Sequence, residues 1–217
     1  MTQDNGASPH SYKGNSYTLV VGTDSTWSLR AWICAQLAEL PLDLHIIDLA
    51  KQSYKTDILQ YSPTGLVPAL LTPNGVIHDS LAICEYLNEM SSHPLLPHSI
   101  EERSLARSLC AEMHSGFTHL RSQCPFTLDK VAPITSFTSD LKQELQRVES
   151  IFNSAKGKFM FENATMVDSF YAILAFRLNQ YGIQFSGKAG DYQKSLLDWP
   201  ILQQAIQQAT LWREVRS

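Results

Sequence analysis

The sequence predicts an α/β domain followed by an all-helical domain. Strand-like and helix-like segments alternate over residues 17–90, whereas strand-like segments nearly vanish after residue 99. A chain of 217 residues with 44% hydrophobic and 18% charged residues can bury cores for two such domains. The expected organisation is a polar arm at 1–16, the α/β domain at 17–90, a linker at 91–99 and the helical domain at 100–217.

The first three predicted elements are a strand at 17–21, a helix at 25–40 and a strand at 44–49. Apolar residues recur at helical spacing in the helix, Ser25 or Thr26 can cap its first turn, and Pro41 can end it. A strand–helix–strand connection of this length predicts that the two strands are parallel.

The α/β domain is then completed by a short helix at 54–61, strands at 68–72 and 75–78, and a helix at 80–90. Pro73, Asn74 and Gly75 form a strong turn signal, which predicts a hairpin between the two strands. The predicted element order is therefore β-α-β-α-β-β-α.

The second half is predicted to contain helices at 100–124, 136–155, 165–182 and 200–215. The third of these is apolar nearly all round and should be the buried central helix. Thr165 and Asp168 form a capping box at its start, a structural feature that we keep out of the functional site.

Composition narrows the function classes. The formal charge of -4 argues weakly against nucleic acid as a partner, because binding phosphates requires a basic face. No apolar stretch approaches the roughly 18 residues of a membrane span, and the polar start lacks a signal peptide. Four cysteines without a CxxC or a zinc-like spacing suggest free thiols and no metal. Free thiols together with the missing export signal suggest a cytoplasmic protein, and the missing apolar span suggests no membrane partner.

Two features suggest a binding edge for a short peptide. Pro68 lacks a backbone donor, so it suits the start of an edge strand, and a cis Val67–Pro68 bond would turn the Val67 backbone outward for an added strand. Ser80 is a plausible N-cap for the following helix, whose first amides would attract a ligand carboxylate. The alternative is that Asp79 and Ser80 only cap that helix.

The element order, the Val67–Pro68 pair and the segment HDSLAICEYL (78–87) resemble the glutathione-binding domain of the glutathione S-transferase superfamily. This resemblance implies a thioredoxin-like domain followed by a helical bundle, glutathione as co-substrate and a homodimer. It also implies that Val67 pairs with the cysteinyl backbone of glutathione and that Asp79 and Ser80 hold its γ-glutamyl end. Asp79 stands where the family usually has Glu or Gln.

The loop at 22–30 is the predicted place of the chemistry. A free thiol has a pKa of about 8.5, so the thiolate needs a hydroxyl donor near a helix start. The segment STWSLRAW (25–32) resembles the bacterial serine-type, zeta-like branch of the family, and we favour Ser25 as the catalytic donor, with Thr23 and Thr26 as alternatives. Ser25 could instead be an N-cap only.

The remaining candidate residues are Trp27, His114, Phe117 and Arg121 for the substrate pocket and Lys55 for the glycine carboxylate of glutathione. His114, Phe117 and Arg121 would share one face of the helix predicted at 100–124. The preferred function is a glutathione transferase acting on a small electrophile. The alternatives are a glutathione-dependent cis-trans isomerase of the maleylacetoacetate or maleylpyruvate type, whose acidic substrate His114 and Arg121 would help bind, and a non-catalytic glutathione-binding or regulatory protein.

Overall fold

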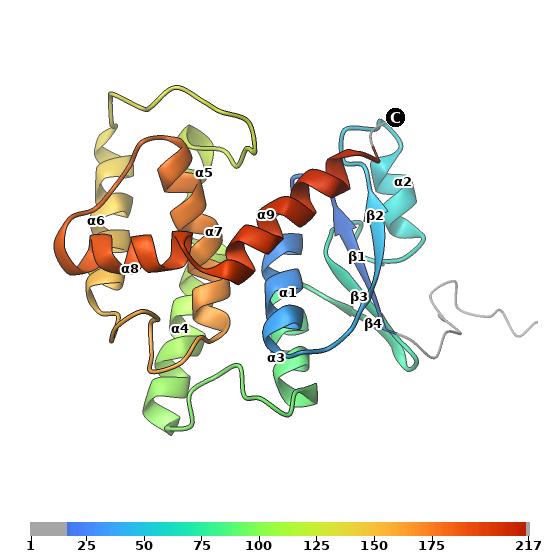
Figure 1. Cartoon of the computed structure of the whole chain (residues 1–217). Coiled ribbons are helices and arrows are strands. Elements are labelled where there is room, and N and C mark those ends of the chain that lie inside the picture. The colour runs from blue at the N-terminus through green and yellow to red at the C-terminus, as the bar shows by residue number, and fades with distance from the viewer. Residues whose placement is uncertain (1–16, 216–217) are drawn as a thin grey trace, which may run out of the picture.

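A four-stranded sheet in the order β2-β1-β3-β4 forms the centre of the first half of the computed structural model (Figure 1). The structure describes residues 17–215, so the arm predicted at 1–16 lies outside the described residues. The strands are β1 Thr18–Gly22, β2 Asp43–Ile47, β3 Ala69–Thr72 and β4 Gly75–His78. Strands β1 and β2 are parallel and β3–β4 is an antiparallel hairpin, which confirms both predicted pairings.

Both faces of the sheet are covered by helices, because successive strand side chains point to opposite faces and both sets are apolar. Leu19 and Leu70 join the large core that includes α1 Thr26–Leu37 and α3 Ser80–Met90. On the opposite face, Val20 packs in a smaller core with residues of α2 Tyr54–Leu59. The helix α1 is thus buried on the side of the sheet that faces the second half.

The second half is helical, as predicted. Its elements are α4 Ile100–Ser115, α5 Thr118–Gln123, α6 Ser139–Asn153, α7 Met166–Gln180, α8 Gly187–Leu197 and α9 Pro200–Arg213. Helix α7 is buried nearly all round, and α9 runs back across α1 toward the sheet (Figure 1). None of the helices between residues 17 and 215 combines the length and hydropathy needed to cross a membrane.

Two predictions for this half were wrong in detail. The helix expected at 100–124 is broken into α4 and α5, because Gly116 leaves the helix in an extended conformation and Phe117 adopts φ 57°. Helix α8 was not predicted, since its residues are mostly polar and include two glycines. As a consequence Arg121 does not continue the helix that carries His114.

The predicted capping box at the start of α7 is confirmed. The Asp168 carboxylate is buried and accepts bonds from the Thr165 amide at 2.8 Å, the Met160 amide at 2.8 Å and the Tyr192 hydroxyl at 2.8 Å. Burial raises the pKa of Asp168, and these hydrogen bonds oppose the rise. The capping box and the bonds of Asp168 therefore link the start of α7 to Met160 before the helix and to Tyr192 after it.

We predict that Asp168→Ala lowers the free energy of unfolding by about 3 kcal/mol, because it leaves several buried donors unpaired. Tyr192→Phe removes only one of these bonds and should cost about 1 kcal/mol. Urea denaturation followed by circular dichroism measures both values. Equal losses in the two variants would show that the carboxylate contributes no more than its bond to Tyr192.

Candidate functional site

A cavity of about 400 Å³ lies between the sheet half and the helical half. It is lined by Trp27, Thr64, Leu66, Val67, Pro68, His78, Asp79, Ser80 and His114. Six of these were predicted as site residues from the sequence, namely Trp27, Val67, Pro68, Asp79, Ser80 and His114. Thr64, Leu66 and His78 were missed, although the last two directly neighbour predicted residues.

Val67 forms one wall of the cavity where the chain enters β3. The Val67–Pro68 peptide bond is cis, and Val67 lies outside the strand ladder that begins at Ala69. At the end of β1, a Cβ atom on Gly22 would lie 2.8 Å from Val67 Cγ2 and 2.7 Å from Leu49 Cδ1. Only glycine therefore lets β1 approach this wall so closely.

The start of α3 forms the opposite wall, and here one prediction was wrong. The N-cap is Asp79, whose Oδ1 accepts the Leu81 amide at 2.7 Å, whereas Ser80 is the first residue of the helix. The Asp79 backbone adopts φ 58° and ψ 152°, which lies outside the left-handed helical region that Asp tolerates, so this N-cap is strained. Ser80 is 1% exposed, and its Oγ has no partner within residues 17–215. A buried hydroxyl without a partner is a natural contact for a polar ligand group.

His114 brings the helical half into the site. Its Nε2 lies 3.0 Å from Asp79 Oδ2, which joins α4 to the start of α3. Its Nδ1 is buried and has no partner in the described part of the chain. Two residues that line the cavity therefore each carry a polar atom without a partner in the described chain, Ser80 Oγ in the first half and His114 Nδ1 in the second.

The hydroxyl groups predicted to do the chemistry lie around the start of α1. Ser25 is its N-cap and accepts the Ser28 amide at 3.2 Å, while Ser28 Oγ accepts the Gly22 amide at 3.1 Å. Thr23 donates to Asp48 at 3.3 Å, and Thr26 is the first residue of the helix. All three candidate hydroxyls are buried, and none of them is among the residues that line the cavity.

The remaining candidates lie apart from the cavity lining. Lys55 is exposed on α2, and Phe117 is buried between α4 and α5. Arg121 donates to the Gly116 carbonyl at 3.0 Å, and its guanidinium lies 4.9 Å from the centre of the Trp27 ring. Arg121 thus contacts Trp27, which is one of the residues that line the cavity.

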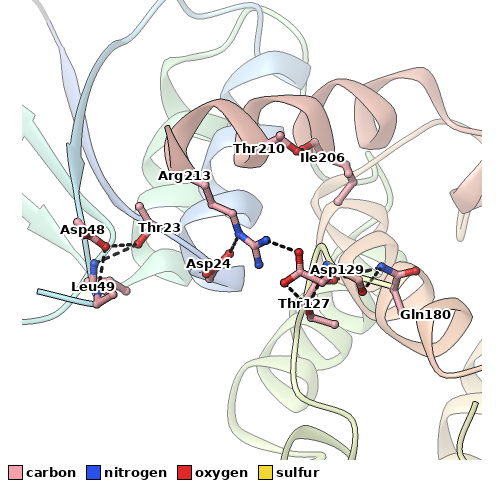
Figure 2. A network of polar contacts seen from close by, with 11 residues as sticks. Thr23, Asp24, Asp48, Leu49, Thr127, Asp129, Gln180, Ile206, Thr210 and Arg213 are labelled. Atoms are coloured by element: carbon pink, nitrogen blue, oxygen red, sulfur yellow. Dashed lines mark hydrogen bonds and ion pairs between the residues drawn. The ribbon is translucent and has the colours of Figure 1, made fainter. Parts of the chain in front are cut away.

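A polar network holds the loop before α1 (Figure 2). Arg213, near the end of α9, donates to Asp24 at 2.6 Å and to Asp129 at 2.9 Å. Asp24 adopts φ 58° and directly precedes the N-cap Ser25. The last helix of the chain therefore fixes the loop that carries the candidate hydroxyls.

Comparison with known families agrees with this arrangement. The family described as "Glutathione S-transferase, N-terminal domain" matches residues 24–90. That range contains the start of α1, the cis proline and the start of α3. Of the residues predicted to contact glutathione, it leaves out the alternative donor Thr23.

Similar whole proteins fall into more than one functional group. A stringent starvation protein A homolog from Coxiella burnetii is 28% identical over 180 residues, which cover 82% of this chain and 83% of that protein. A probable maleylacetoacetate isomerase from Caenorhabditis elegans is 31% identical over 99 residues, 45% of this chain and 46% of that protein. A glutathione transferase homolog from Burkholderia GL BGR1, crystallised with bound glutathione, has a TM-score of 0.68 at 24% identity and covers 91% of this chain and 99% of that one.

The contact between Arg213 and Asp24 predicts that Arg213→Gln loosens the loop at 22–28. Because partly buried ion pairs contribute up to about 1 kcal/mol, amide exchange in this loop should become roughly twofold to fivefold faster. Hydrogen–deuterium exchange with mass spectrometry measures the rate. The control is Arg147→Gln, which breaks a similar two-bond pair with Glu112. Faster exchange in both variants would contradict a specific role for Arg213.

Proposed function

The chain belongs to the glutathione S-transferase superfamily, and from this premise we propose that it is a glutathione transferase acting on a small electrophile. The observation that carries the proposal is the Ser80 hydroxyl, which is buried and unpartnered on the cavity wall at the first turn of α3. The proposal includes glutathione as co-substrate without a metal, and a cytoplasmic homodimer.

The cavity residues divide the work of holding glutathione. Ser80 Oγ and the first amides of α3 receive the carboxylate of the γ-glutamyl end, since a helix start favours anions. The Asp79 carboxylate, positioned by His114, takes the neighbouring ammonium group. The Val67 backbone, outside the strand ladder, pairs with the cysteinyl residue as an added strand. This placement directs the sulfur toward the start of α1.

Ser25 is the proposed donor to the glutathione sulfur. Its oxygen already accepts the Ser28 amide, which leaves the hydroxyl hydrogen available and makes the group a stronger donor. A thiolate at this position also faces the positive end of α1. The thiolate then attacks the electrophile, which Trp27 holds beside it.

Two other functions are favoured by specific similarities. The match to a stringent starvation protein A homolog over 82% of the chain favours a regulatory protein that binds glutathione without turnover. The match to a probable maleylacetoacetate isomerase favours a glutathione-dependent isomerase. Turnover assays with a thiol-conjugation substrate and with maleylacetoacetate separate the three functions. The transferase would convert the thiol-conjugation substrate, the isomerase would convert maleylacetoacetate, and the regulatory protein would convert neither.

We predict that Ser80→Ala weakens glutathione binding about tenfold to hundredfold, as expected for losing a hydrogen bond to a charged group. Isothermal titration calorimetry measures the dissociation constant. Thermal stability should not fall, because Ser80 Oγ has no partner within the described chain. The matched control is Ser104→Ala, an exposed serine of α4. Unchanged affinity in Ser80→Ala would remove the main support for this binding mode.

We also predict that Ser25→Gly raises the pKa of the bound glutathione thiol by about one to two units, because the thiolate loses a hydrogen bond. Glycine is tolerated at an N-cap at little cost, so the helix start is retained. The ultraviolet absorbance of the thiolate, measured as a function of pH, gives this pKa. Thr26→Val is the paired variant and should leave it unchanged. The reverse result would assign the donor role to Thr26.

A further inference from the structure

Three arginines lie close enough to interact electrostatically, and two of them contact Trp27. Arg30 of α1 lies 5.8 Å from the Trp27 ring centre and 5.0 Å from that of Phe170, and Arg121 lies 4.9 Å from Trp27. Arg177 of α7 donates to the Cys124 carbonyl at 2.9 Å. Within residues 17–215, none of the three guanidinium groups forms a hydrogen bond or ion pair with a carboxylate. We name Arg30, Arg121 and Arg177 the arginine cluster.

Arg30 is the least compensated member of the arginine cluster. It is 0% exposed, and its Nε and Nη1 have no partner in the described chain. Burial, reinforced by the charges of Arg121 and Arg177, lowers the pKa of Arg30 to about 9. The guanidinium therefore remains charged at neutral pH. Its buried donors are costly unless an anion is nearby.

The neighbouring groups do not supply that anion. Cys84 and Cys110 lie near Arg30, but burial raises the pKa of each thiol well above its usual value, so both remain neutral. Burial lowers the pKa of Arg121, and the charge of Glu144 only opposes this shift. The two carboxylate oxygens of Glu144 already accept the amides of α5 at 3.1 and 2.7 Å. The arginine cluster keeps an excess of positive charge.

Trp27 both lines the cavity and contacts two members of the arginine cluster. It is 38% exposed and lines the cavity together with Ser80 and His114, while both Arg30 and Arg121 lie against its ring. Arg121 is only partly buried, so it is the member of the arginine cluster that a ligand can contact. Positive charge held in low-dielectric surroundings attracts an anion strongly.

We propose that the second substrate carries a carboxylate, which Arg121 contacts while the nearby charges of Arg30 and Arg177 stabilise it. The inference rests on the proposed function, since Arg121 adjoins the glutathione cavity through Trp27, which lines it. A suitable second substrate has a terminal alkene joined to a ketone. In a conjugate addition to it, the thiolate sulfur forms a bond to the terminal alkene carbon. The π electrons move to the carbon next to the ketone, which takes a proton from water. The carboxylate takes no part in these bonds and acts only in binding.

Ethacrynic acid and its methyl ester are suitable probes, because their reactive alkene is remote from the carboxylate and is equally electrophilic in both. We expect the protein to prefer the acid by about tenfold in kcat/KM. Arg121→Gln should lower kcat/KM for the acid about tenfold and change that for the ester less than twofold. Arg121→Lys should restore part of the loss. Arg147→Gln, which removes a surface arginine paired with Glu112, is the control.

Binding of the saturated acid, in which the alkene is reduced, tests the anion contact without turnover. Calorimetry in the presence of S-methylglutathione should show about tenfold tighter binding of the saturated acid than of its ester, and loss of this difference in Arg121→Gln. Arg30→Met provides a second variant that leaves the Arg121 contacts to α4 in place; it should weaken acid binding about threefold and leave ester binding unchanged.

The outcomes separate the two proposals. Equal affinity for the saturated acid and ester, or equal losses for both in Arg121→Gln, would overturn the carboxylate subsite. Selective binding of the saturated acid without conjugation of either probe would support the subsite and contradict the proposed transferase function.

Discussion

The burial of α1 is the constraint on which the rest of the structure depends. This helix contacts α3 and the sheet on one side and α7 and α9 on the other, so it belongs to the cores of both halves. Leu29 and Ile33 are fully buried within it. Its start cannot move without disturbing both halves, and that start is where the candidate hydroxyls and Trp27 lie. Packing therefore places the site at the boundary between the halves.

Polar contacts reinforce this boundary close to the site. His114 of α4 contacts Asp79 and Arg213 of α9 contacts Asp24, so the start of α3 and the loop before α1 are each held by a side chain of the second half. Such contacts add little to global stability, because partly exposed ion pairs contribute weakly. These contacts instead fix the position of the helical half relative to the site. A shift of the helical half would move the start of α3 and the loop before α1.

The sequence predicted most of what depends on short segments. The turn chemistry at Pro73–Gly75 led to the hairpin, and the cavity walls at Val67 and Ser80 followed from a proline at a strand start and a polar pair at a helix start. One local choice failed, because Asp79 and Ser80 are both capable N-caps and only the observed bond from the Leu81 amide to Asp79 decides between them.

Contacts between distant segments were beyond prediction from one sequence. Asp24 and Arg213 are 189 positions apart, and no pattern along the chain relates them. Nothing along the chain marks Arg30 as buried, since its burial depends on the packing of α7 against α1. The break at Gly116 had a local signal, but the apolar spacing on both sides favoured one continuous helix.

The two proposals, thiol activation by Ser25 and an anionic second substrate, would be linked through α1. Lowering a thiol pKa by two units requires about 2.7 kcal/mol. A helix start contributes about 0.3–1 kcal/mol and one hydrogen bond to a charged group about 1.5–3 kcal/mol, so Ser25 and α1 together can reach that value. A carboxylate brought beside the resulting thiolate would meet like-charge repulsion. In the proposed complex, the positive charge of Arg30, one turn along the same helix, would oppose that repulsion, so one helix would serve both the nucleophile and an anionic partner.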